Sequence, residues 1–215
     1  MKKKIRFPLQ LKTMLIIVVM AALLSGIAVL TSQRVFAARN DNTFRQEATE
    51  LAKTISAVVD PADVADLQQA VAAIYDAAEV RVGSEGLGTP AYDAYIRLYE
   101  GITERESYRS LYGVLRGIQE ANTVESVYLL YVDVPTRATV YLVDASDEPC
   151  PPGNFDPVYE QNFAVLSDPE VGFPAYITNT PEYGWLVSAA VPVHDAQGNV
   201  AAYAFTAFME ISVKA

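Results

Sequence analysis

The sequence has one cysteine, Cys150, and one histidine, His194. One cysteine cannot form a disulfide within the chain, and one cysteine with one histidine is too few for a Cys/His zinc site. The acidic run "DEPCPPG" around the cysteine disfavours a thiolate. His194 is next to a predicted turn, where a passive exposed side chain is a simpler interpretation than a pH sensor. We therefore expect neither a metal nor a cofactor.

The short motifs of common hydrolases are also missing. Neither G-x-S-x-G nor H-E-x-x-H occurs. The glycines of "GSEGLGTP" (83–90) do not form a dinucleotide fingerprint, and no strand is predicted before them. Paired carboxylates are the one catalytic arrangement that the sequence leaves open. The residues favour a protein that is not an enzyme.

Basic residues are few and unevenly placed. The chain has 16 Lys and Arg against 26 Asp and Glu, a formal net charge of −10. Five basic residues precede residue 13, and the first acidic residue is Asp41. The rest of the chain is strongly acidic, so it does not suit a phosphate backbone, and we expect no nucleic-acid partner. A hydrophobic content of 51% excludes general disorder.

Residues 13–32, "TMLIIVVMAALLSGIAVLTS", form a run of twenty residues without a charge. About 20 apolar residues span a hydrocarbon core, and the basic tail at 1–12 predicts a cytoplasmic N-terminus. A signal peptide cleaved after "VFA" (35–37) is the alternative. The run exceeds the usual apolar region of such peptides, so we favour an uncleaved membrane anchor. Both interpretations place the rest of the chain outside the cytoplasm.

Residues 33–121 form a predicted helical region. Apolar residues recur at three- and four-residue spacing from Phe44 to Val59, which is typical of an amphipathic helix. Asp60-Pro61 interrupts this helix, and a second helix is predicted over 61–80, with proline in its first turn. A third helical stretch covers 91–121, with a break at Gly101 and a restart capped by Ser107.

The pattern changes to strands over 122–213. "VESVYLLYVDV" (124–134) and "RATVYLVDA" (137–145) predict a hairpin. The segment after it is rich in Pro, Asp and Gly and too long for a simple turn, which indicates a functional or mobile loop. "AYITNT" (175–180) predicts a short strand, "PEYG" (181–184) a turn, and "GWLVSAAVPVHDAQGNVAAYAFTAF" (184–208) two long strands. Helices followed by five strands indicate an α+β domain with an antiparallel sheet.

The first of the last two strands has two different faces. Ser188, Ala190 and Pro192 share one face, while the bulkier Val187 and Val191 share the other. The bulky face suits packing against helices. The small face, under the long loop, leaves volume for a ligand.

Three stretches resemble Cache domains, the PAS-like extracytoplasmic sensors of bacterial receptors. "AAVPVHDAQGNVAAY" (189–203) resembles the terminal hairpin, and "YRSLYGVLRGIQEANTVESVYLLYVDV" (108–134) resembles the helix that leads into the first strand. "VYLVDASDEPCPPGNFD" (140–156) resembles the second strand and its proline-glycine loop. The similarity covers residues 34–213. The aromatic-and-arginine pattern of the two-module members that bind amino acids is not recognisable, and a single sheet favours the single-module form.

The resemblance implies a long N-terminal helix, continuous with the membrane helix, on one face of a five-stranded PAS-like sheet. It places a ligand on the other face, under the loop between strands two and three. It also implies a homodimer in the bacterial cell membrane and a sensor whose output module is a cyclase, a phosphatase, a kinase or a chemotaxis module.

Six residues are candidates for binding a small-molecule ligand of unknown class. Tyrosines supply area and a hydroxyl, Asp144 suits a cationic or hydroxylated ligand, and an arginine clamps a carboxylate. Core packing for the tyrosines, turn capping for the aspartate and a solvated helix face for Arg109 and Arg116 are the structural alternatives. A calcium site in "DASDEP" lacks EF-hand spacing, and a register slip of one residue would move the strand residues to the opposite face. The candidates are Arg109, Tyr128, Tyr141, Asp144, Tyr176 and Ser188.

The sequence therefore leaves three hypotheses for the function. In a sensor, a ligand shifts the sheet and loop, and the N-terminal helix carries the displacement across the membrane. In a structural or dimerisation module, the same fold binds no ligand. In an enzyme, paired carboxylates would act on a substrate.

Overall fold

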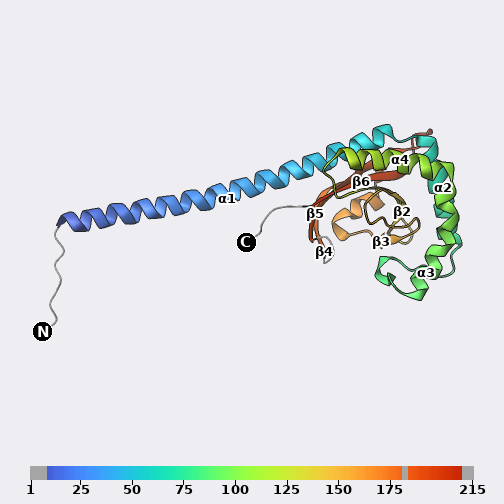
Figure 1. Cartoon of the computed structure of the whole chain (residues 1–215), viewed down its shortest axis with the longest axis horizontal. Coiled ribbons are helices and arrows are strands. Elements are labelled where there is room, and N and C mark those ends of the chain that lie inside the picture. The colour runs from blue at the N-terminus through green and yellow to red at the C-terminus, as the bar shows by residue number, and fades with distance from the viewer. Residues whose placement is uncertain (1–8, 181–183, 210–215) are drawn as a thin grey trace. The chain divides into compact units, whose positions relative to one another are not determined.

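The computed structural model describes residues 9–180 and 184–209 (Figure 1). The chain divides into a first unit of residues 1–43 with 214–215 and a second unit of residues 44–213. Helix α1 (Leu9–Val58) supplies the described part of the first unit. In the described part of the chain, no helix has both the length and the apolarity that a membrane crossing needs. The described part of α1 therefore does not qualify as the membrane anchor that we expected over residues 13–32.

The helices of the second unit begin and end largely where the sequence predicts. The last turns of α1 end at Val58, and Asp60 caps α2 (Pro61–Ala77) by accepting a hydrogen bond from the amide of Ala62 at 2.8 Å. An Asp N-cap followed by Pro at N1 is a strong start signal. This confirms the predicted interruption at Asp60-Pro61.

The third predicted helix is three elements instead of two. They are α3 (Pro90–Ile96), the 3₁₀ helix η2 (Arg97–Glu104) and α4 (Glu106–Ala121). Gly101 lies inside η2, so the predicted break there is wrong. Ser107 is not the N-cap of α4 either, because its hydroxyl donates to the Asp66 carboxylate of α2 at 2.6 Å and Arg105 occupies the cap position. The Ser107 hydroxyl, which would otherwise cap the helix, instead forms the contact between α4 and α2.

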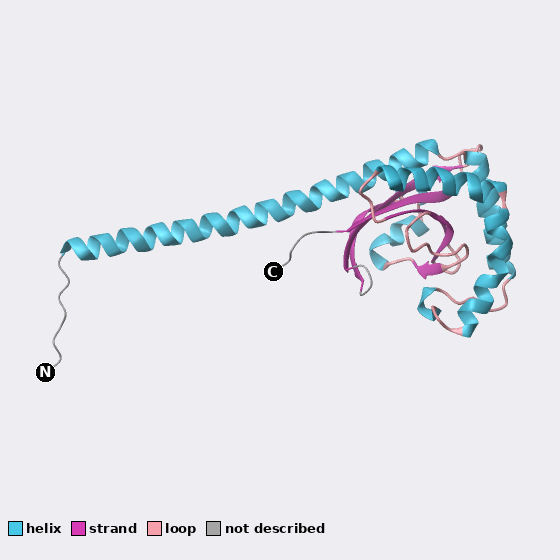
Figure 2. Cartoon of the chain, in the orientation of Figure 1, coloured by secondary structure: helices cyan, strands magenta, loops and turns pink. Residues whose placement is uncertain are grey.

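The strands form one antiparallel sheet of six members in the order β3-β2-β1-β6-β5-β4. The sheet curls, as Figure 2 shows in magenta. The expected count of five was wrong because a short strand pairs with the edge of β2 inside the predicted loop. Three residues without apolar alternation give no strand signal. The strands are β1 (Ser126–Asp133), β2 (Ala138–Asp144), β3 (Phe155–Pro157), β4 (Phe173–Thr180), β5 (Gly184–His194) and β6 (Val200–Met209).

The predicted turn at 181–184 falls mainly on residues 181–183, which lie outside the described residues. The α+β class and the antiparallel sheet are confirmed.

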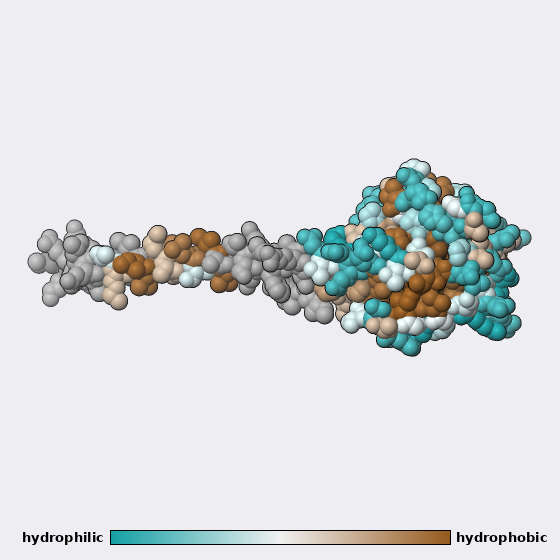
Figure 3. Space-filling view, turned by 90° about the horizontal axis from the view of Figure 1, so that it is seen from above, coloured by the Kyte–Doolittle hydropathy of each residue, from teal (hydrophilic) through white to brown (hydrophobic). Residues whose placement is uncertain are grey.

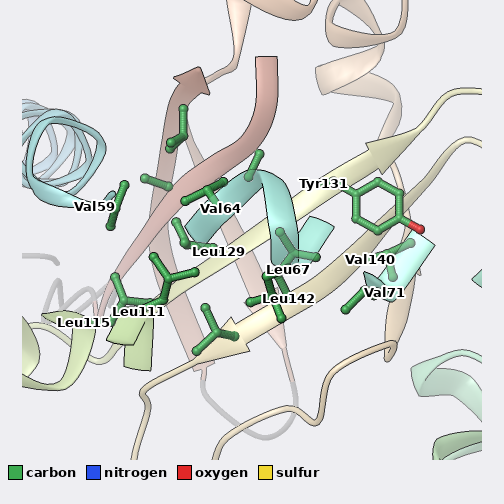
Figure 4. Packing of buried hydrophobic residues seen from close by; sticks show 14 of the residues in the cluster. Val59, Val64, Leu67, Val71, Leu111, Leu115, Leu129, Tyr131, Val140 and Leu142 are labelled. Atoms are coloured by element: carbon green, nitrogen blue, oxygen red, sulfur yellow. The ribbon is translucent and has the colours of Figure 1, made fainter. Parts of the chain in front are cut away.

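One face of the sheet packs against helices. Leu67 of α2 and Leu115 of α4 are fully buried against Leu129 and Leu142 of the central strands (Figure 4). Each such side chain contributes about 1.5–3 kcal/mol through burial. The last turns of α1 join this face through Thr206, whose Oγ1 donates to the carbonyl of Ala48 at 2.9 Å. The predicted packing of the long helix on one face of the sheet is therefore seen.

The other face of the sheet is covered by residues 145–172. This segment contains β3 and two 3₁₀ helices, η3 (Glu160–Leu166) and η4 (Pro169–Val171). A smaller apolar cluster of Leu130, Val165 and Phe205 joins the segment to the sheet. The exterior of this unit is largely polar, with apolar residues gathered in one area of the view in Figure 3. Residues 145–172 and the sheet enclose a cavity between them.

Candidate functional site

A cavity of about 810 Å³ lies on the sheet face that the helices do not cover. Five of the six residues predicted to contact a ligand line it: Tyr128, Tyr141, Asp144, Tyr176 and Ser188. Because strand side chains alternate between faces, the register brings them together. Tyr128 is paired with Asp144 on one side and with Phe205 on the other. Tyr176 is paired with Ser188.

The floor of the cavity, formed by the sheet, has a row of small residues. Ser126 is paired with Ala207, which is paired in turn with Ser188 of β5. These three side chains do not fill the space that larger residues would occupy. The small face predicted for the strand at Ser188 and Ala190 therefore faces the cavity side, while Val187 and Val191 pack on the helix side.

A neighbouring row of the floor is aromatic. The rings of Tyr128 and Phe205 are stacked, with centroids 5.1 Å apart, and Phe173 packs on Phe205 at 4.7 Å. Tyr141 packs on Tyr128 at 5.2 Å. Burial raises the pKa values of Tyr128 and Tyr141 well above their ordinary value, so both hydroxyls stay protonated and neutral. Tyr131 points to the opposite side, into the core beside Tyr75 of α2.

Asp144 is 3% exposed and caps the turn that follows β2. One carboxylate oxygen accepts from the amide of Ser146 at 2.9 Å and from the Ser146 hydroxyl, and the other accepts from the amide of Cys150 at 2.9 Å. Burial nevertheless raises the pKa of Asp144, because desolvation outweighs these hydrogen bonds. The turn-capping role is observed, and a role in ligand binding stays a prediction.

Sequence reasoning missed a second carboxylate, that of the half-buried Asp156 of β3. Its side chain accepts a hydrogen bond from the hydroxyl of Ser84, and burial is the main cause of its raised pKa. Glu85 and Glu148 also line the cavity. The lining thus contains four carboxylates and, among the described residues, no Lys, Arg or His. No periodic signal marks Glu85, Glu148 and Asp156, because none of the three lies on a strand predicted from the sequence.

Tyrosines of α3 and η2 hold the segment that borders the cavity. The hydroxyl of Tyr95 donates to the carbonyl of Gly153 at 2.9 Å, and that of Tyr92 donates to Asn154 Oδ1 at 3.1 Å. The backbone of Tyr141 exchanges hydrogen bonds with this turn, accepting from the Gly153 amide at 2.9 Å and donating to the Asn154 carbonyl at 2.8 Å. This part of the predicted loop is therefore fixed by contacts from distant segments.

Asn162 of η3 is a further lining residue that the sequence did not reveal. The residue is only 3% exposed. Its Nδ2 has no hydrogen-bond partner within the described part of the chain. Buried amide donors are normally paired, so an unpaired donor on a residue that lines the cavity is an exception.

Arg109 does not join the other candidates. It is exposed on α4, which packs on the opposite face of the sheet, and it is not a lining residue. Arg109 is therefore not placed to bind a ligand carboxylate in this cavity, and it lies on a solvated helix face instead. Arg116 forms ion pairs with Glu120 and Asp147 at 2.8 Å each.

The cysteine that lines the cavity, Cys150, is held as a thiol. Burial raises the pKa of Cys150 to about 12, so the sulfur stays a thiol. Among the described residues, no group of three His, Cys, Asp or Glu side chains is placed to hold a metal ion. The arrangement suits a bound molecule that is held by aromatic surface, hydroxyls and carboxylates.

Comparisons with known proteins add a structural likeness. No protein-family model matches the chain, and no curated protein matches it. Among solved structures, it is similar to the ligand-binding domain of the chemoreceptor Tlp3 of Campylobacter jejuni, in complex with 4-methylisoleucine. The identity is 10% and the TM-score 0.34, over 79% of this chain and 60% of that domain.

Proposed function

We propose that the second unit is the small-molecule sensing domain of a membrane-bound signalling receptor, located outside the cytoplasm. The observation that carries the proposal is the cavity of about 810 Å³. Its floor has a row of small residues beside a row of aromatic side chains. Pockets of about 300–1,000 Å³ with a few polar groups are typical of ligand sites. Among the described residues that line this one, no hydroxyl or thiol has a histidine or lysine beside it as a base.

The contacts of β6 support a route from the cavity to α1. Ala207 lines the cavity, and the preceding residue, Thr206, donates to the carbonyl of Ala48 in α1 at 2.9 Å. On β5, the carbonyl of Pro192 accepts from Ser56 Oγ of α1 at 2.7 Å. A ligand that shifts these two strands would therefore shift the hydrogen-bond partners of the helix. The size of the effect is limited by the difference in ligand affinity between the two positions.

We further propose that residues 13–32 anchor the protein in the cell membrane. The charge-free run supports the anchor, and the apolar side chains of Ile17 and Leu24 are each 63% exposed (brown part of α1 in Figure 3). Against this stands the finding that no described helix qualifies as a span. Carbonate extraction of membranes decides between them, because an integral protein stays in the pellet.

The assignment to Cache domains and the homodimer also stay predictions. Light scattering would test the homodimer.

A thermal-shift screen of the full chain in non-ionic detergent tests the sensing role. A ligand at a hundred times its Kd adds about 2.7 kcal/mol, and about 2–4 °C per kcal/mol predicts a rise of roughly 5–10 °C. Ser188→Leu, which fills the floor, should abolish the rise, whereas the same change at the exposed Ser110 of α4 should leave it intact. If no compound shifts protein shown to be free of co-purified ligand, the alternative holds, a ligand-free structural or dimerisation module.

A further inference from the structure

The charge of the lining limits what the cavity accepts. Glu85, Asp144, Glu148 and Asp156 line it, and no basic side chain does so among the described residues. An organic acid would place its carboxylate among these groups without a cationic partner. Like charges brought together in a partly buried site oppose binding, so the lining acts against anionic ligands.

The aromatic lining adds an attraction for positive charge. Tyr128 and Tyr141 form one pair of rings, and Tyr159 and Tyr176 form a second, edge-to-face pair with centroids 6.5 Å apart. The faces of such rings attract ammonium groups electrostatically. Three of the rings lie on β1, β2 and β4, and Asp144 is at the end of β2, whereas Asp156 lies on β3. Two independent features therefore favour the same ligand charge.

Asn162 points to a second feature of the ligand. Its Nδ2 is buried at the cavity wall without a partner in the described part of the chain. A donor in this position is satisfied by an oxygen acceptor, such as a hydroxyl or a carbonyl, on a bound molecule. This donor is independent of the carboxylates and the rings.

We infer, on the basis of the proposed sensing role, that the cavity binds small organic cations that carry an oxygen acceptor and rejects organic acids. The carboxylates and tyrosine rings receive the ammonium group, and Asn162 donates to the oxygen. Burial raises the pKa values of Asp144 and Asp156, and within the described part of the chain no basic side chain lines the cavity beside them, so the ligand's charge would supply the counterion that this lining lacks.

The test uses matched probes on the full chain in non-ionic detergent, with calorimetry and thermal shift as readouts. The panel contains primary and quaternary amines, each with a neutral isostere and a carboxylate analogue. Choline, 3,3-dimethylbutanol and ethyltrimethylammonium form one set, because the second lacks only the charge and the third lacks only the hydroxyl. We expect at least one cation to bind tenfold or more tightly than its neutral isostere, and no carboxylate analogue to bind.

Two variants test the assigned contacts. Asp156→Asn should weaken the cation tenfold or more while leaving the neutral isostere unchanged. Asn162→Leu should weaken the hydroxylated cation several-fold and leave the cation without the hydroxyl unchanged. If neutral or anionic compounds bind and cations have no advantage, the inference on ligand class is wrong while the sensing role stands. If no compound of any charge binds, both are wrong.

Discussion

Gly153 offers a sharp test of how the wall of the cavity is built. Its φ of +80° is in the left-handed region, and a Cβ there would overlap the ring of Tyr99, which is 1% exposed. Tyr99 cannot easily move aside, because its hydroxyl lies 2.8 Å from that of Tyr95. Gly153→Ala should therefore cost about 1–2 kcal/mol for the backbone and about 1–3 kcal/mol for overpacking, a loss of roughly 2–5 kcal/mol.

Gly198 provides the matched control for the same substitution. Its φ is +86°, and a Cβ there would meet no atom within 4 Å. Gly198→Ala should thus cost only the backbone contribution of about 1–2 kcal/mol. Urea denaturation of both variants and the parent gives the difference, which we expect to be about 1–3 kcal/mol. Equal losses at the two glycines would refute the packing of Tyr99 against the turn that closes the cavity.

Two further predictions concern acidity and the docking of α1. Burial raises the folded-state pKa values of Asp144 and Asp156 above 3.8, so the native state binds these protons more tightly than the unfolded state. Their contribution to stability is fully present below pH 3.8 and is lost as pH rises through the folded pKa values. Asp156→Asn should therefore flatten the rise in stability on acidification, measured by urea denaturation from pH 7 to pH 4, and an unchanged slope would contradict this. Thr206→Val removes the buried hydrogen bond to Ala48 and should cost about 0.5–1.5 kcal/mol. The exposed Thr103→Val, whose hydroxyl bonds only within η2, serves as control and should cost less.

The parts of the fold that follow from local pattern were predictable. Asp60-Pro61 ends one helix and starts the next because the signal lies in adjacent residues. The two faces of β5 follow from a period of two, which places Ser188 and Val187 on opposite sides whatever the rest of the chain does. The same period puts Tyr128 and Tyr131 on different faces once the strand is known.

The missed features depend on contacts between distant residues. Ser107 has the right type and position for an N-cap, but Asp66, 41 residues away, binds its hydroxyl. The turn at Gly153 is fixed by Tyr95, which lies 58 residues away. A single sequence does not indicate which of several tyrosines reaches a given turn. For the same reason, neither β3 nor the position of Asp156 at the cavity could be predicted from the Pro- and Asp-rich segment.

This division separates volume from selectivity in the cavity. The floor comes from strand residues such as Ser188 and Ala207, whose small size creates space and whose position follows from alternation. The wall residues Asp156 and Asn162 come from the segment after β2, which other elements hold in place, and they set the charge and the donor that a ligand meets. Sequence pattern alone therefore predicts space for a ligand, whereas the cation preference that we propose also depends on residues of the folded segment. Substitution of Asp156 and Asn162 would then change the preferred ligand, while the small floor residues Ser188 and Ala207 stay as they are.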